Sequence, residues 1–143
     1  MKKHFKKLLV ATAIGLTVSP TFACELNDVT TETLRGIVNR QGGYPVSDAQ
    51  CAILNSHHLA LKVSGQAAVL GGVNIGWALV TLQNGDRVAS TKSGTSTHIN
   101  RVDVGSQDTA NKQFHIALQD AIDALDWKGA ANEFSSSGKS IVH

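Results

Sequence analysis

Residues 106–125 carry the clearest structural pattern in the chain. Apolar residues recur there at intervals of three and four, which is the period of a helix with one buried face. These residues are Ala110, Phe114, Ala117, Leu118, Ala121, Ile122 and Leu125. Ser106 precedes them as a helix cap, and the opposite face is polar. Because such a helix is stabilised mainly by packing of its apolar face, another element must cover that face.

The pattern of residues 59–90 predicts that an antiparallel sheet covers this face. Apolar and polar residues alternate from Leu59 to Ser64 and again from Val73 to Leu79, as in strands with one buried face. Gly71-Gly72 marks the turn between these strands. Asn84-Gly85 predicts a second hairpin with a type I′ turn, because both residues accept positive φ angles.

A third strand follows from the second hairpin. Counting outward from Asn84-Gly85 places Thr81 opposite Val88. Residues 91–97 are polar and predict a loop or a frayed strand end. Residues 98–104 alternate again and predict a fourth strand at an edge of the sheet.

The register of the first hairpin has two solutions. A two-residue loop at Gly71-Gly72 places Leu61 and Val63 on the face opposite Trp77, whereas one extra loop residue places all three together. We favour the longer loop, because a single sheet in a chain this small has only one well-covered face. Trp77 is then expected in the core.

Two helices are predicted before the sheet. Residues 25–41 predict the first, with Thr30 as its cap. Ser47 and Gln50 form a capping box that begins the second. The expected fold is therefore α+β, with two N-terminal helices, an antiparallel sheet of three or four strands, and a C-terminal helix packed on one sheet face.

The first 23 residues resemble a secretory signal peptide. Four lysines precede an apolar run from Leu8 to Val18, which is shorter than the ~20 residues of a membrane span. We therefore expect residues 1–23 to be removed on export to the periplasm. Residues 24–129 are expected to form one α+β domain, and the Ser-rich residues 130–143 a flexible tail.

The two cysteines of the chain, Cys24 and Cys51, predict a disulfide, because an even number in an exported protein is typical of one. The alternative is that Cys24 carries a lipid anchor as the first residue of an outer-membrane lipoprotein. Phe22 fits such a lipidation signal poorly, and lipidation leaves Cys51 as a single thiol. The disulfide is the preferred interpretation.

No catalytic or metal-binding motif stands out. His57 and His58 are adjacent, and with His98 they define the best place for a small hydrolase or metal site, but no known ligand spacing is present. We expect no cofactor and no metal. The chain's net charge of +2 includes the four N-terminal lysines, and the rest has no basic cluster, so nucleic acid is not expected as a partner.

Tyr44 and Trp127 are the candidate partner contacts. Tyr44 lies beside Pro45 in the link between the first two helices, and Trp127 follows the last helix, where partial exposure is expected. Aromatic side chains at such positions are able to bury a large area against another protein.

Part of the chain resembles a known module. Leu79-Val80-Thr81-Leu82, Asn84-Gly85, Val88-Ala89-Ser90 and the apolar stripe of residues 110–125 follow one another in the order hairpin, polar segment, helix. Residues 77–125 thereby resemble bacterial envelope accessory proteins of the curli-assembly-factor and periplasmic-lipoprotein type. The resemblance implies a non-catalytic assembly or binding protein and assigns no site residue. Because the chain is small, exported and disulfide-linked and has no catalytic motif, the expected function is a non-enzymatic protein-binding or accessory protein, such as an envelope assembly factor or a toxin-immunity protein.

The cysteine interpretation is testable on the exported protein. Thiol titration without reductant is expected to find no free thiol, and Cys51→Ser is expected to lower the free energy of unfolding by about 2–4 kcal/mol. Two titratable thiols in the native protein would contradict the predicted disulfide. A mass increase that matches acyl chains would support the lipid anchor.

Overall fold

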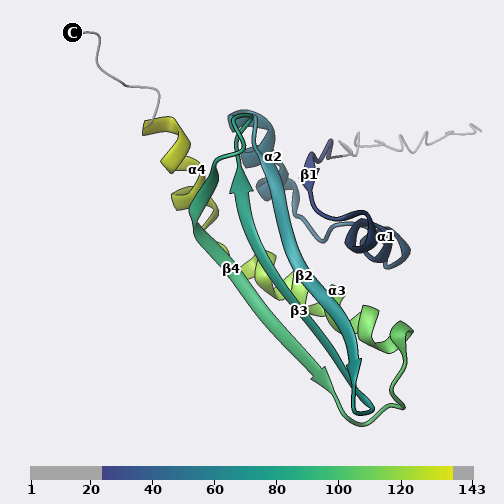
Figure 1. Cartoon of the computed structure of the whole chain (residues 1–143). Helices are drawn as coiled ribbons and strands as arrows, with labels where there is room; N and C mark the ends of the chain where they lie inside the picture. Colours follow the sequence, from purple (N-terminus) through teal and green to yellow (C-terminus); the bar gives the residue numbers. More distant parts are fainter. Residues whose placement is uncertain (1–23, 137–143) are drawn as a thin grey trace, which may run out of the picture.

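The computed structural model describes residues 24–136 and shows an α+β domain (Figure 1). Its strands are β1 (Asp28–Val29), β2 (Ala60–Leu70), β3 (Val73–Gln83) and β4 (Ala89–Asn100). Its helices are α1 (Glu32–Arg40), α2 (Asp48–His57), α3 (Gln107–Ala124) and α4 (Trp127–Ser136). The predicted signal peptide lies outside the described residues, as do residues 137–143. None of the described helices has the length and apolarity needed to cross a bilayer.

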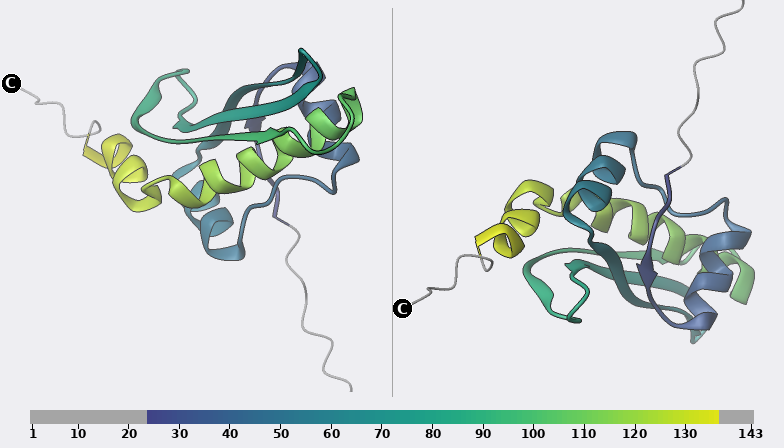
Figure 2. Two further views of the ribbon diagram at one scale, coloured as in Figure 1. Left: turned by 90° about the horizontal axis from the view of Figure 1, so that it is seen from below. Right: turned by 90° about the horizontal axis from the view of Figure 1, so that it is seen from above.

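The four strands form one sheet in the order β1-β2-β3-β4. β2, β3 and β4 are antiparallel neighbours, and the short β1 pairs in parallel with β2. Figure 2 shows that α3 runs along one side of the sheet. The predicted α+β architecture, with a C-terminal helix packed on one sheet face, is confirmed, although the sheet is mixed because of β1.

The core lies between α3 and the sheet. Apolar side chains of β2 and β3 meet the stripe of α3, and α1 and α2 close the core at one side. The fully buried members include Leu61, Val80, Leu82, Phe114, Leu118, Ile122, Val38 and Leu54. All seven residues predicted for the stripe of the last helix are buried.

Glycines let α3 approach the sheet closely. A Cβ atom at Gly76 of β3 would overlap the backbone of Phe114, and one at Gly94 of β4 would overlap the carbonyl oxygen of Ala121. A Cβ atom at Gly65 of β2 would overlap the ring of Phe114 and the carbonyl oxygen of Trp77. The backbone of α3 therefore lies directly on the sheet at Gly76 and Gly94, where no side chain larger than hydrogen fits.

The first hairpin has the two-residue loop. Leu70 pairs with Val73, and Gly71 and Gly72 have φ angles of 56° and 79°, as in a type I′ turn. The favoured longer loop is therefore wrong. Leu61 and Val63 lie under α3, and Trp77 lies on the opposite face of the sheet.

The second hairpin also differs from the prediction. Arg87, not Gly85, has a positive φ (64°), and its N–H donates to the carbonyl of Asn84 at 3.0 Å. This geometry is a three-residue loop that ends in a left-handed residue. This loop aligns Gln83 with Ala89, and a register shift between Thr81 and Gln83 then pairs Thr81 with Ser93 instead of Val88.

β4 includes the whole segment predicted as a loop, residues 91–97. Residues 93–100 pair with β3 and the strand ends at Asn100, so residues 101–104 of the predicted fourth strand are outside the sheet. The apolar alternation that identifies a half-buried strand is weak here, because the outward side chains are threonine, serine and isoleucine. Threonine has a high β propensity without being apolar, which explains the missed strand.

The first helix is shorter than predicted. Thr31, not Thr30, caps α1, and β1 occupies part of the residues predicted as helix. The predicted capping box of Ser47 and Gln50 is confirmed. The disulfide between Cys24 and Cys51 is also confirmed, with Cα atoms 5.8 Å apart. Because the Cys24 sulfur is in this bond, it is not available for a thioether link to lipid.

The expected C-terminal tail begins inside a helix. Ala130 and Ala131 of α4 are buried against the core. The carboxylate of Asp126 accepts a hydrogen bond from the N–H of Gly129 at 3.0 Å, as a helix cap does. The boundary predicted at residue 129 is therefore not the end of the folded structure.

The contact between α3 and Gly76 is testable by substitution. Gly76→Ala places a methyl group against the backbone of α3 and is expected to lower the free energy of unfolding by about 3 kcal/mol. Gly85→Ala is the matched control, because its Cβ meets no atom within 4 Å. Urea unfolding of both variants measures the difference, and equal stabilities would contradict the close contact.

Candidate functional site

The face of the sheet opposite α3 is the main candidate surface. In Figure 1 this face points toward the viewer and α3 lies behind it, so no described helix covers its middle. Trp77 lies near the centre and is 39% exposed. Register places Gln66 and Thr97 beside it on the neighbouring strands. We call the residues of β2, β3 and β4 that point this way the open face.

The open face has an apolar end and a hydroxyl-rich end. Toward the β2–β3 turn it carries Ala68, Ile75 and Ile99 in one cross-strand row, with Leu70 beyond them. Toward the other end it carries Ser64, Leu79, Thr95, Lys62, Thr81 and Ser93. Among the β2–β4 residues of this face, Lys62 is the single charged one. The surface is thus nearly uncharged and graded in polarity.

An ordered loop extends the apolar end. Val102 and Val104 in the link from β4 to α3 are 95% and 87% exposed. The fully buried Asn74 holds this loop, because its Nδ2 donates to the carbonyls of Asp103 (3.4 Å) and Val104 (3.3 Å). Its Oδ1 accepts from the N–H of Ser106 at 2.8 Å. The two valines are therefore presented by a loop tied to the sheet.

The two tryptophans exchange their expected positions. Trp127 is 8% exposed, and its indole N–H donates to the carbonyl of Ile122 at 2.8 Å. The expected partial exposure of Trp127 is wrong. Trp77, expected in the core, is the exposed one, because the two-residue loop at Gly71-Gly72 turns it away from α3. The positive φ angles that two adjacent glycines accept are the sequence signal for this outcome.

Tyr44 is half-buried and has a structural role. Its hydroxyl donates to the carboxylate of Asp28 at 2.9 Å, and Arg35 bonds the same oxygen at 3.0 Å. Burial, reinforced by the bond to Asp28, raises the pKa of Tyr44. These contacts join the link between α1 and α2 to β1. Its use as a partner contact stays a prediction.

The three histidines do not form one site. His57 ends α2 and His58 follows it, whereas His98 lies on β4, where its Nε2 is 2.6 Å from a carboxylate oxygen of Asp120. Register aligns His98 with Ala67, seven residues along β2 from its first residue, Ala60, which corresponds to roughly 23 Å at the usual rise of a strand. His58 lies before that first residue. Within residues 24–136 no three metal-ligating side chains are grouped.

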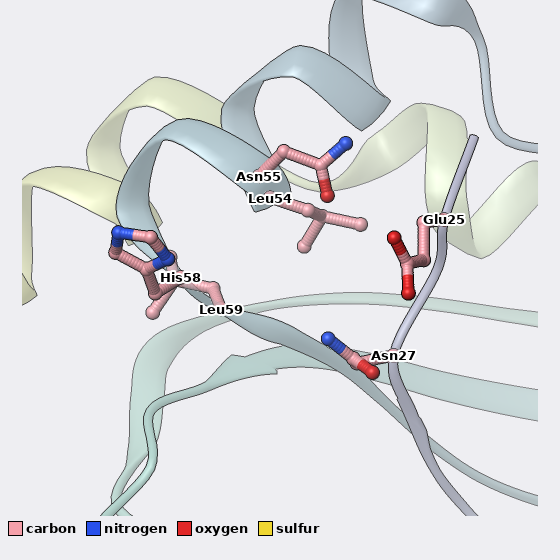
Figure 3. A pocket seen from close by; sticks show the side chains of 6 residues that line it. All are labelled: Glu25, Asn27, Leu54, Asn55, His58 and Leu59. Atoms are coloured by element: carbon pink, nitrogen blue, oxygen red, sulfur yellow. The ribbon is translucent and has the colours of Figure 1, made fainter. Parts of the chain in front are cut away.

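A shallow pocket lies beside His58. It has a volume of about 380 Å³ and lies between the chain that leads into β1 and the connection from α2 to β2 (Figure 3). Its lining residues are Glu25, Asn27, Leu54, Asn55, His58 and Leu59. Figure 3 shows Glu25 and His58 on opposite sides of it, so they do not form an acid–base pair. The pocket offers a polar rim over an apolar floor, without a nucleophile.

His58 has an unusual backbone conformation for a residue with a side chain. Its φ of 52° places it in the left-handed region as the C-cap of α2, a position that glycine usually takes. Its N–H donates to the carbonyl of Asn55 at 3.3 Å, and the N–H of Leu59 donates to the carbonyl of Leu54 at 2.9 Å.

The sequence pattern did not indicate the pocket, because its residues come from segments that only the disulfide-linked fold brings together.

Comparison with protein-family models, with curated proteins and with solved structures finds no match to this chain. The choice between the open face and the pocket therefore depends on their geometry. The open face extends over three strands and presents an exposed tryptophan, and it is the stronger candidate.

The strain at His58 is testable. His58→Gly is expected to raise the free energy of unfolding by about 0.5–1 kcal/mol, because glycine adopts the left-handed conformation without a steric penalty. Ala52→Gly, in the exposed part of the same helix, is expected to lower it by about 1 kcal/mol. Denaturant unfolding compares them. A loss of stability in His58→Gly would mean that the imidazole makes contacts that outweigh the strain.

Proposed function

We propose that this chain is an exported, non-enzymatic binding protein that contacts a partner protein through the open face. The observation that carries the proposal is the exposed Trp77 at the centre of a sheet face that no helix within residues 24–136 covers. Exposed apolar patches rimmed by polar residues are characteristic of interaction sites on soluble domains.

The composition of the open face supports a protein partner. Cores of protein interfaces are depleted in charge and enriched in aromatic side chains, with polar residues around them. Trp77 with Ile75 and Leu79 reproduces this core, and the serines and threonines of the neighbouring strands reproduce the rim. The ordered valines of the loop after β4 add apolar area at one end.

The proposed compartment is the periplasm. The disulfide between Cys24 and Cys51 is typical of an oxidising, exported environment. The lysine-rich and apolar start of the chain supports export through a cleaved signal peptide. An envelope assembly factor or a toxin-immunity protein fits these features and the hairpin-helix resemblance.

The proposal predicts a specific loss of binding. Trp77→Ala is expected to weaken capture of the partner from periplasmic extract at least tenfold, because a central aromatic residue is often a hot spot. Ile116→Ala is the matched control, since Ile116 is also exposed (41%) but lies on α3. Immobilised wild-type and variant proteins, each shown to be folded by circular dichroism, are compared by mass spectrometry of the retained proteins.

The outcome that contradicts the proposal is equally specific. If Trp77→Ala retains the same proteins as the wild type while Ile116→Ala loses them, the contact surface lies on α3. If neither change alters capture, the open face is not the binding surface.

A further inference from the structure

β4 is an edge strand with little protection along most of its length. Residues 93–100 contain no charged residue and no proline, and they pair with β3 in continuous register without a bulge. Sheet edges are normally protected against pairing by charges, prolines, bulges or a covering element. Within residues 24–136 no strand pairs with this side of β4, so its backbone groups are suited to receive another strand.

The start of the same edge is already covered. The carboxylate of Glu133 in α4 accepts hydrogen bonds from the N–H groups of Thr91 (2.7 Å) and Lys92 (3.3 Å). It also accepts from the hydroxyl of Thr91 at 2.8 Å. A side chain thus takes the place that a neighbouring strand would have, and the segment available for pairing begins at Ser93.

We propose that β4 of a second copy of this chain pairs with residues 93–99, antiparallel and with Ser96 opposite Ser96. A two-fold axis that relates antiparallel edge strands is perpendicular to the sheet, so opposite residues must lie on the same face. Thr95 then faces Thr97 of the partner subunit on the open face. On the α3 side, Gly94 faces His98 of the partner subunit.

Charge complementarity supports a second copy as the occupant. In this register Arg101 lies opposite Thr91 of the partner subunit. The backbone N–H of Thr91 donates to the carboxylate of Glu133 in the same subunit as that Thr91. The exposed Arg101 guanidinium therefore meets a carboxylate at each end of the paired segment. Residues 93–99 contain no Asp, Glu, Lys or Arg, and Lys92, which comes near Arg101 of the partner subunit, is already paired with Asp126 at 3.5 Å.

Side-chain volume fits the same register. His98 is held toward α3 by its contact with Asp120 and needs space where the second copy arrives. Gly94 of the partner subunit has no side chain at that position. The pairing leaves both open faces on the same side, so two copies of Trp77 belong to one continuous surface.

The area of a strand pair sets the expected strength. A stable dimer buries roughly 800 Å² per subunit, and one short edge offers less than this. We therefore expect a concentration-dependent dimer, and covalent trapping is the appropriate probe.

Cysteine substitution tests the register. Opposite residues of an antiparallel pair have Cα atoms roughly 4.5–5.5 Å apart, which a disulfide spans. Ser96→Cys is expected to give a covalent dimer on mild oxidation, with Cys24–Cys51 intact. Ser93→Cys is the control, because in this register it is roughly 20 Å from its counterpart and is expected to remain monomeric.

Sedimentation equilibrium of the oxidised wild-type protein completes the test. The mean mass is expected to rise from one chain to two with concentration, and Arg101→Glu is expected to shift this rise to at least tenfold higher concentration. A wild-type protein that remains monomeric throughout would overturn the proposal, and would favour a strand of another protein as the occupant. Equal cross-linking of Ser93→Cys and Ser96→Cys would overturn it as well.

Discussion

The structure depends on the direct contact between the backbone of α3 and the sheet. Gly76 and Gly94 lie under Phe114 and Ala121, and their missing side chains set the distance between helix and sheet. Close packing contributes dispersion energy over the whole length of the helix and leaves no space for a second layer of side chains there. The large buried residues are therefore concentrated around these contacts, with Phe114 at the centre.

This contact also determines which surface is left for function. Because α3, α1, α2 and α4 all contribute to one core cluster, the apolar residues on the other face of the sheet have no described partner within the chain. Trp77 belongs to β3, between Gly76 and Ala78 on the buried side, so the same strand supplies the helix contact and the exposed aromatic ring. One face of β3 thus packs against α3, and its other face carries the candidate functional surface.

The sequence predicted the elements that have strong local signals. The stripe of α3 and the capping box of α2 depend on short-range patterns, whereas the disulfide follows from the presence of two cysteines, and the structure confirms all three. The hairpin registers depend on loop geometry, and a change of one residue at Gly71-Gly72 reverses every side chain of a strand. Because of this one-residue error in the loop, Trp77 was expected in the core and the open face was not predicted.

Other features required tertiary information. β4 is rich in serine and threonine, so its apolar period is weak, and α4 follows α3 after a break of two residues in a segment that composition describes as a tail. The pocket beside His58 combines residues from the chain before β1 and from the end of α2. No local pattern connects those segments, and only the folded chain places them together.

Tryptophan fluorescence is the most direct test of the exposed open face, because the chain has two tryptophans, of which Trp77 is exposed on that face and Trp127 is buried in the core. Trp127→Phe leaves Trp77 as the single emitter, and Trp77→Phe leaves Trp127. We expect acrylamide to quench Trp77 strongly and the emission of Trp77 to be red-shifted, whereas Trp127 is expected to be protected and its emission blue-shifted. If Trp127 is quenched as readily as Trp77, or more so, then the open face is not the surface described.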